Sequence, residues 1–286
     1  MWNTRMAACT GTGHRMYHQQ CQDRTAKQSE HGVTAVALAD GAGSASLSHL
    51  GAACAVDTAC SLLCQKFDEL YNAPNPHQMR KQVVDTVQQA ISKEATRYQV
   101  KPADMACTLL AVAVHNDRYL LFHVGDGVIA YQKAGKLLVA SHPRNGAFAN
   151  MTTFVTSRSA AQSAYVCKGI QSAVEGFVLM SDGCEQALYQ KRTARVAPLL
   201  GYMLQWSELL QPDIGEAMLQ NVLEHQIAAC TSDDCSLVVM SRSGDGLGQW
   251  DRLTPREQGR ILGIATQKKS RRRHMLRQIR RYSAKI

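Results

Sequence analysis

The stretch MACTLLAVAVHNDRYLLFHVGDGVIAYQKAGKLLVAS, residues 105–141, decides the fold class. It contains three or four apolar runs with the length and composition of β-strands, separated by HND, GDG and KAGK. Short polar groups that contain Gly, Asn or Asp favour the turns of antiparallel hairpins. We therefore expect this stretch to form a meander of antiparallel strands.

Further elements flank the meander on both sides. Apolar runs predict strands over residues 32–40, 151–157, 175–181 and 235–241. Apolar residues at helical spacing, such as Val83, Val87 and Ile91, predict long helices over residues 46–70 and 77–99, with an interrupted helical region over residues 184–229. Strands in meanders and helices in pairs indicate an α+β fold in which helices cover the sheets.

Composition limits the class of protein. The chain has 286 residues, 45% of them hydrophobic, which is enough for one large core with or without an appendage. It has neither an 18-residue apolar run nor a secretion signal at its N-terminus, so we expect no membrane span and a cytoplasmic location. The ten cysteines are dispersed and form no CxxC pair, which favours reduced thiols and does not indicate a zinc site.

The net charge of +9 lies in the tail. Residues 267–286 hold nine Lys or Arg and no acid, whereas the rest of the chain holds 23 basic and 23 acidic residues. Thr254, Pro255 and Glu257 predict the start of a helix after a Gly-rich linker. We predict a main domain over residues 1–242 and a basic, helical appendage over residues 243–286. The tail is suited to nucleic acid, an anionic membrane or an acidic partner, or it is a solvated helix that only aids solubility.

Carboxylates follow or precede the predicted strands. The stretch VALADGAGSA, residues 36–45, ends a buried strand on Asp40, and Asp126, Asp182 and the pair Asp233–Asp234 occupy similar positions. Each alone fits a turn, a hairpin or a helix cap. If the strand ends converge, however, the repulsion among these carboxylates favours a bound cation, and oxygen ligands select Mg²⁺ or Mn²⁺.

The order of these motifs resembles one family. CQD, ADGAG, ACTLLAVAV, HVGDG, VLMSDG and SDDCSLVVM follow one another over roughly residues 10–241, as in the metal-dependent type 2C, or PPM, protein phosphatases. The DGAGSA form and the Gly-His and CQD opening are most similar to a bacterial branch. The resemblance implies a four-layer α-β-β-α sandwich of two antiparallel sheets flanked by helix pairs, with two Mg²⁺ or Mn²⁺ ions between the sheets.

The resemblance also implies roles for single residues. Asp40 would bridge both metals, the Gly41 carbonyl would bind one, and Asp182 and Asp233 would complete the first. Asp23 would hold a metal-bound water and Asp126 a weaker third ion. Asp234, also counted with the metal site, stands where the family often has Asn. The implied reaction is hydrolysis of phosphoserine or phosphothreonine in proteins, a Ser/Thr kinase among them, by a water that the two metals activate.

Several positions depart from the family pattern. Ala42 follows the Asp-Gly pair where many members have His, so the proton donor is unassigned. His18 occupies the usual place of a phosphate-binding Arg, and Arg15 and His14 are nearby substitutes. In the GAFANMT region, Ala147 and Met151 also replace the acidic residues typical of the branch.

Two alternatives remain open at this stage. One is a non-catalytic, phosphatase-like module that binds phosphoproteins and is tethered by its basic tail. The other is a thiolate phosphatase, because CTGTGHR matches the Cys-x5-Arg loop with Cys9 and Arg15. Only eight residues precede Cys9, which leaves little chain for the core strand that such a loop follows.

Overall fold

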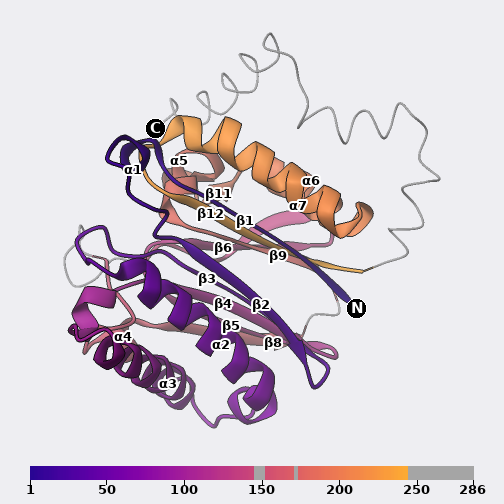
Figure 1. Cartoon of the computed structure of the whole chain (residues 1–286). Coiled ribbons are helices and arrows are strands. Elements are labelled where there is room, and N and C mark those ends of the chain that lie inside the picture. The colour runs from indigo at the N-terminus through magenta and orange to yellow at the C-terminus, as the bar shows by residue number, and fades with distance from the viewer. Residues whose placement is uncertain (145–151, 171–172, 244–286) are drawn as a thin grey trace.

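The computed structural model describes residues 1–144, 152–170 and 173–243 (Figure 1). The main strands are β1 (Trp2–Cys9), β2 (Arg24–Glu30), β3 (Val33–Ala39), β4 (Leu109–His115), β5 (Arg118–Val124), β6 (Val128–Lys133), β7 (Lys136–Ser141), β8 (Tyr165–Ile170), β9 (Val174–Met180) and β12 (Cys235–Arg242). The helices are α1 (Thr12–Met16), α2 (Ser48–Tyr71), α3 (Pro76–Arg97), α4 (Ala160–Ser163), α5 (Glu185–Leu188), α6 (Leu199–Leu209) and α7 (Pro212–Val222).

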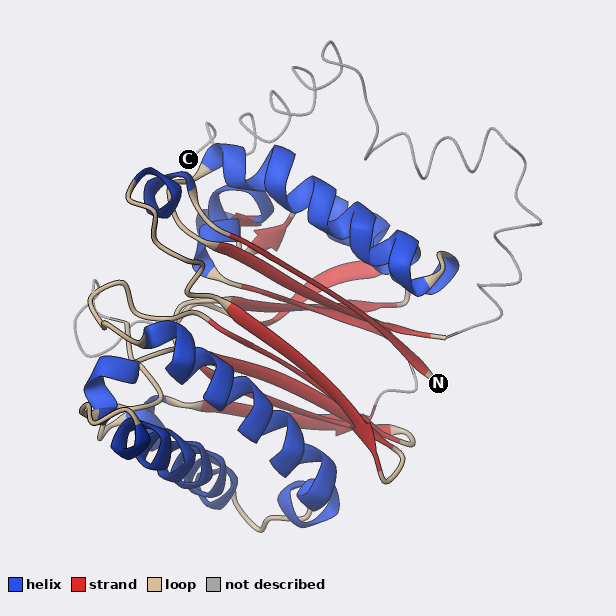
Figure 2. Cartoon of the chain, viewed as in Figure 1, coloured by secondary structure: helices blue, strands red, loops and turns tan. Residues whose placement is uncertain are grey.

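The strands form two antiparallel sheets that stack face to face. One has the order β1-β12-β9-β6-β7 and the other the order β2-β3-β4-β5-β8. Figure 2 shows the long helices on the outer faces, with α2 and α3 against one sheet and α6 and α7 against the other. A short hairpin of β10 (Tyr189–Gln190) and β11 (Arg195–Val196) follows α5. The predicted α+β fold and its four-layer α-β-β-α arrangement are confirmed.

Alternation along the strands explains why both faces of each sheet are buried. In β3, Ala35 and Ala37 face the helices, whereas Val36 and Leu38 belong to the cluster between the sheets. Successive side chains of a strand point to opposite faces, so a continuous apolar run fills two layers at once. The small alanines on the outer face let α2 pack close to the sheet.

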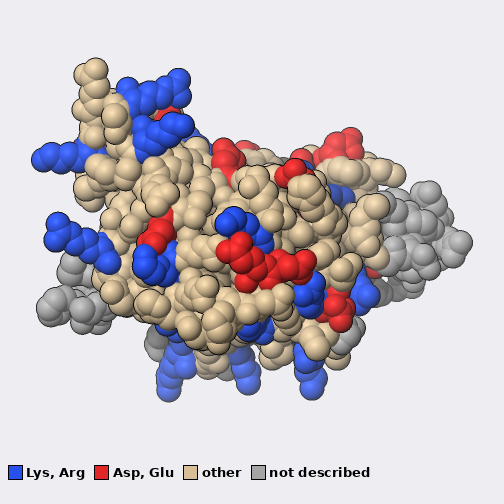
Figure 3. Space-filling model, turned by 90° about the horizontal axis from the view of Figure 1, so that it is seen from below, with Lys and Arg blue, Asp and Glu red and all other residues tan. Residues whose placement is uncertain are grey.

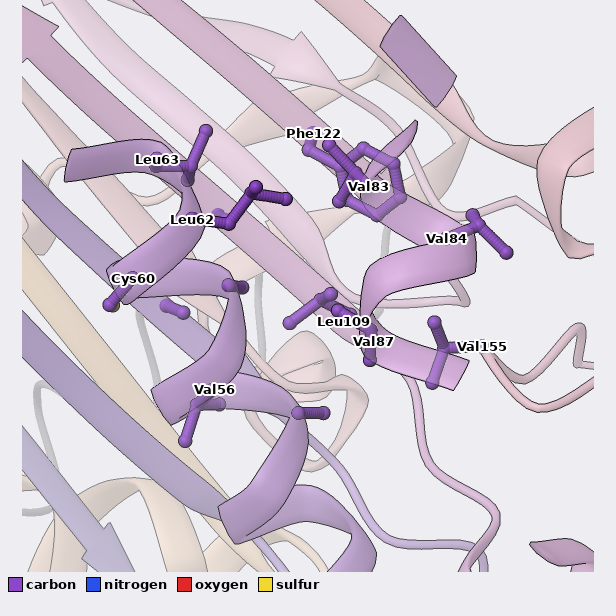
Figure 4. Close-up of a cluster of buried hydrophobic side chains, with 14 of the residues drawn as sticks. Val56, Cys60, Leu62, Leu63, Val83, Val84, Val87, Leu109, Phe122 and Val155 are labelled. Atoms are coloured by element: carbon purple, nitrogen blue, oxygen red, sulfur yellow. The ribbon is translucent and has the colours of Figure 1, made fainter. Parts of the chain in front are cut away.

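The long helices fill the layer outside the second sheet. Figure 4 shows Val56, Leu63 and Val87 among the side chains of α2 and α3 that meet Leu109 of β4 and its neighbours. Pro76 stands at the N-terminus of α3, and the Asn75 side chain accepts a hydrogen bond from the Gln78 N–H. The two predicted helices agree with the structure to within two residues.

Two local predictions are wrong. HND and KAGK do close hairpins, but GDG does not, because β5 and β6 belong to different sheets. Gly125, at φ +119°, lets the chain cross between the sheets there. No strand forms over residues 152–157, where the Gln88 side chain donates to the carbonyls of Val155 and Ser157. Those carbonyls are satisfied without a sheet partner.

Some sequence predictions fall outside the described residues. These are the basic tail, the helix that was to start near Thr254, and the segment with Ala147 and Met151. In the part that is described, no helix has the length and apolar character needed to cross a membrane. All ten cysteines are free thiols.

Candidate metal centre

The acidic strand ends meet at one edge of the sandwich. Asp40 follows β3 and Asp23 precedes β2, both in one sheet, whereas Asp182 follows β9 and Asp233 precedes β12 in the other. Asp126 lies in the crossing from β5 to β6. This is the left-hand end of the molecule in Figure 1. The two sheets therefore contribute carboxylates to a shared space between their ends.

Three of these carboxylates are in mutual reach. Oxygen atoms of Asp40, Asp126 and Asp182 all lie within 4.8 Å of one another. Each of the three residues is partly buried. Asp233 is exposed at the rim, and its Oδ1 accepts a hydrogen bond of 2.9 Å from the Asp234 N–H. We refer to Asp40, Asp126 and Asp182 as the carboxylate cluster.

Local hydrogen bonds fix the position of Asp40. Its N–H donates to Thr108 Oγ1 at 2.9 Å, and the Thr108 N–H donates to its carbonyl at 2.8 Å. An isolated bridge pairs Gly41 with Cys107. The N–H groups of Ala42 and Thr108 donate the hydrogen bonds of this bridge, so the carbonyl of Gly41 takes no part in it. That oxygen is a fitting additional ligand beside the cluster.

Burial and mutual repulsion disfavour the charged carboxylates. Burial, followed by the charges of Asp23 and Asp182, raises the pKa of Asp40 well above its usual range. Burial is also the main cause for Asp182, whose pKa rises to about 6. It raises the pKa of Asp23 to about 7, against the opposing effect of the Ser181 and Ser236 hydroxyls. A nearby positive charge would reverse these shifts.

The donor set fits a hard divalent cation. Asp23 is 1% exposed, and neither of its carboxylate oxygens has a well-formed hydrogen bond in the described part of the chain. Oδ1 of Asp182 is also buried and lacks a well-formed hydrogen bond among the described residues. Buried carboxylates left in this state are costly unless a cation or its bound water satisfies them. Oxygen atoms supplied only by carboxylates and a carbonyl suit Mg²⁺ or Mn²⁺.

The remaining predicted residues lie beside this centre. Asp234 is 2% exposed, and each of its two carboxylate oxygens accepts a hydrogen bond from a main-chain N–H group. His14 lies next to it, with 2.9 Å between Nδ1 and Asp234 Oδ1. Arg15 is exposed on α1 and has no acidic partner among the described residues. Asp234 is not one of the three residues of the carboxylate cluster.

Three hydroxyl residues of the site were missed by sequence reasoning. Thr152 donates a hydrogen bond from its hydroxyl to Asp126 Oδ2. Ser181 and Ser236 lie on adjacent strand ends and face Asp23, and Ser181 Oγ also accepts the Ser236 N–H at 2.9 Å. The Ser181-Asp182 pair was a usable signal because the serine precedes the candidate ligand directly. Thr152 gave none, since its contact depends on the crossing of the chain between the sheets.

A buried histidine of β5 is expected to make the fold sensitive to acid. His123 of β5 shares a 2.7 Å hydrogen bond between Nδ1 and Ser141 Oγ of β7, so it joins the two sheets. Burial lowers the pKa of His123 to about 3. The unfolded chain takes up a proton below a pH of about 6.5 and the folded chain does not, so stability falls as the pH falls from about 6.5 toward 3.

We expect His123→Asn to reduce that acid sensitivity. Asn can keep a polar atom near Nδ1 but does not titrate. Between about pH 7.5 and 5.5 the wild type should lose about 1.4 kcal/mol more free energy of unfolding than the variant. Urea unfolding of both proteins in EDTA measures this, because other groups contribute equally to each. Equal losses would show that His123 is not the acid-sensitive group.

Comparisons with known proteins agree with the fold. A family profile described as protein phosphatase 2C matches residues 10–224. The chain is 30% identical over 164 residues to serine/threonine-protein phosphatase 3 of Escherichia coli strain K12. That match covers 56% of this chain and 64% of the relative's length.

Solved structures with the same fold are more distant in sequence. A bacterial serine phosphatase superposes with a TM-score of 0.58 at 14% identity, covering 86% of this chain and 99% of the other. The serine/threonine phosphatase Stp1 from Staphylococcus aureus gives a TM-score of 0.56 at 13% identity, with 85% and 96% covered. The serine/threonine phosphatase of S. agalactiae gives 0.57 at 16% identity, with 84% and 99% covered.

Proposed function

Because the chain belongs to the protein phosphatase 2C family, we propose that it is a metal-dependent phosphatase that hydrolyses phosphoserine and phosphothreonine in proteins. The observation that carries the proposal is the convergence of Asp40, Asp126 and Asp182 from both sheets beside the buried Asp23. A protein that only bound phosphoproteins would have no use for buried carboxylates that destabilise one another.

The residues of the centre have distinct tasks in this proposal. Asp40, the Gly41 carbonyl, Asp182 and Asp233 would hold two Mg²⁺ or Mn²⁺ ions, and Asp126 would hold a weaker third. When bound, such ions supply a water of lowered pKa and neutralise charge on the phosphoryl oxygens. Asp23, whose carboxylate is buried, would orient that water.

Phosphate binding is assigned to α1. Arg15 is exposed beside the loop that carries Asp233 and can form a two-pronged contact with a phosphoryl group, with His14 next to it. Ala42 is buried with Ala45 and Ala106, so that position supplies no proton. Figure 3 shows Lys and Arg side chains projecting from the left-hand end of the molecule, where the acidic strand ends lie in Figure 1. This charge suits an anionic substrate.

Hydrolysis assays test the proposal. The purified chain is assayed on p-nitrophenyl phosphate and on a phosphothreonine peptide with Mn²⁺, with Mg²⁺ or with EDTA. We expect turnover of both substrates only with metal, restored when excess metal follows EDTA. Turnover that survives EDTA would contradict the metal mechanism. Peptide binding without turnover under any condition would favour the non-catalytic binding module instead.

The chemistry of Cys9, rather than its place in the fold, disfavours the thiolate alternative. Contrary to the sequence argument, Cys9 does end a strand, and α1 begins three residues later. However, contact with Cys235, and then burial, raises the pKa of the Cys9 thiol. A nucleophilic cysteine needs the opposite shift. We expect Cys9→Ser to keep metal-dependent turnover of p-nitrophenyl phosphate within about threefold of the wild type, since the thiol is only a packing group. A loss as large as that of a metal ligand would revive the thiolate loop.

The remaining assignments concern partners and place. We propose phosphoproteins as substrates, a Ser/Thr kinase among them, in the cytoplasm. Residues 267–286 supply nine basic side chains that suit nucleic acid, an anionic membrane or an acidic partner. The tail would then determine where the phosphatase acts, and the carboxylate cluster would perform the chemistry.

A further inference from the structure

Asp234 differs from its acidic neighbours in the way its carboxylate is used. Oδ1 accepts the Gly11 N–H at 2.7 Å, and Oδ2 accepts the Gln22 N–H at 2.6 Å. His14 Nδ1 lies 2.9 Å from Oδ1. The residue is 2% exposed. Each oxygen therefore accepts a hydrogen bond from its own main-chain donor. This use of both oxygens argues against Asp234 as an open metal ligand.

The two N–H donors lie at the two ends of one segment, residues 11–22. Gly11 precedes α1, and Gln22 directly precedes Asp23. Near the start of this segment, the Gly13 N–H donates a second hydrogen bond, of 2.9 Å, to the Ser232 carbonyl. At Gly11 the approach is too close for any side chain, because a Cβ would lie 2.3 Å from the main-chain carbonyl of Asp233. Both ends of the segment 11–22 therefore contact the same loop, the one that precedes β12.

We propose that Asp234 is a positioning residue, a carboxylate clamp that closes residues 11–22 onto the loop before β12 and thereby holds Asp23 in the metal centre. The proposal rests on the proposed function for its purpose but not for its geometry. Asp23 is one residue beyond the Gln22 N–H, so the clamp restrains the main chain next to its buried carboxylate. The same clamp keeps α1, with Arg15, beside Asp233.

The clamp requires a carboxylate, although the family often has Asn at this position. The two N–H donors are received by different oxygen atoms. Asn offers one oxygen, and its NH₂ group would face the second N–H, donor against donor. Hydrogen bonds to an ionised acceptor are also stronger than neutral ones. Asp234→Asn is therefore a disruptive change in this chain.

Hydrogen–deuterium exchange tests the clamp without metal or turnover. The amides of Gly11 and Gln22 are followed in EDTA, so a failure of the proposed function does not affect the result. In the wild type we expect both to be protected in the absence of metal. In Asp234→Asn we expect at least one to exchange about tenfold faster or more, as for one lost buried hydrogen bond. Asp57→Asn, on the exposed side of α2, is the matched control and should leave both unchanged.

Metal binding separates a clamp from a ligand. In equilibrium dialysis with Mn²⁺, Asp234→Asn should keep the wild-type number of bound ions with an affinity lower by about tenfold to a hundredfold, as for supporting residues around metal sites. Asp233→Asn, the neighbouring ligand, should bind fewer ions. Two results would overturn the proposal: Asp234→Asn losing an ion with unchanged amide exchange, or wild-type amides of Gly11 and Gln22 that are protected only when Mn²⁺ is present. The second needs no variant, so it holds even if Asp234→Asn does not fold.

Discussion

Asp40→Asn is expected to abolish metal-dependent turnover while making the metal-free protein more stable. In the folded chain, burial and the neighbouring carboxylates raise the pKa of Asp40, so its charge opposes folding when no cation is present. Replacing it by a neutral isostere should increase the free energy of unfolding in EDTA by on the order of 1 kcal/mol. If Asp40 holds the metals as proposed, its loss as a ligand should lower kcat/KM at least about 10³-fold.

Two measurements on the same preparation check whether Asp40→Asn gains stability while it loses activity. Urea unfolding in EDTA gives the stability, and turnover of p-nitrophenyl phosphate with Mn²⁺ gives the activity. Asp57→Asn removes one exposed charge from α2 and should change neither by much. A variant that loses both stability and activity would mean that Asp40 is a structural residue. One that keeps its activity would remove Asp40 from the centre.

Gly183→Ala is expected to damage both the fold and the site. A Cβ on Gly183 would lie 1.9 Å from the Asp234 carbonyl oxygen, so the ends of β9 and β12 would have to separate. Overpacking of this kind costs about 1–3 kcal/mol or more. The same shift would move Asp182 away from Asp233, and a displacement of about 1 Å can lower the rate about 10²-fold.

Gly201→Ala is the matched control for this change. Gly201 lies in α6, where a Cβ would be at ordinary contact distances of 3.7 Å. Alanine also favours the helix, so this variant should be as stable as the wild type or more so. Thermal unfolding and turnover of both variants are compared. A Gly183→Ala protein with wild-type stability would show that the two strand ends are not packed as closely as described.

The elements that could be predicted from the sequence are those whose own residues show a clear apolar pattern. β3, β9 and β12 are continuous apolar runs because both faces are buried, and α2 and α3 carry apolar residues at helical spacing. β1, β2 and β8 escaped detection, and all three are edge strands. β2 reads RTAKQSE, with few buried positions, and β1 contains Arg5, which is buried and donates to the Leu210 carbonyl. Their strand character depends on partners far along the chain.

The candidate site shows the same limit. The strand-end aspartates were visible as a repeated pattern, and the family resemblance supplied their expected roles. What the pattern could not show is direction: Asp233 and Asp234 are adjacent, yet only Asp234 turns inward to meet Gly11 and Gln22. Likewise GDG has the composition of a hairpin turn, and only the course of β6 into the other sheet brings Asp126 to Asp40.

Counting bound Mn²⁺ tests the central claim most directly. The purified chain, freed of metal with EDTA and dialysed against Mn²⁺, should retain two ions per chain with a weaker third at high concentration, and Asp40→Asn should retain fewer. Binding should also raise the unfolding temperature of the wild type, because it neutralises the buried carboxylates. Fewer than one ion per chain, or a count that Asp40→Asn leaves unchanged, would contradict a metal centre built on this cluster.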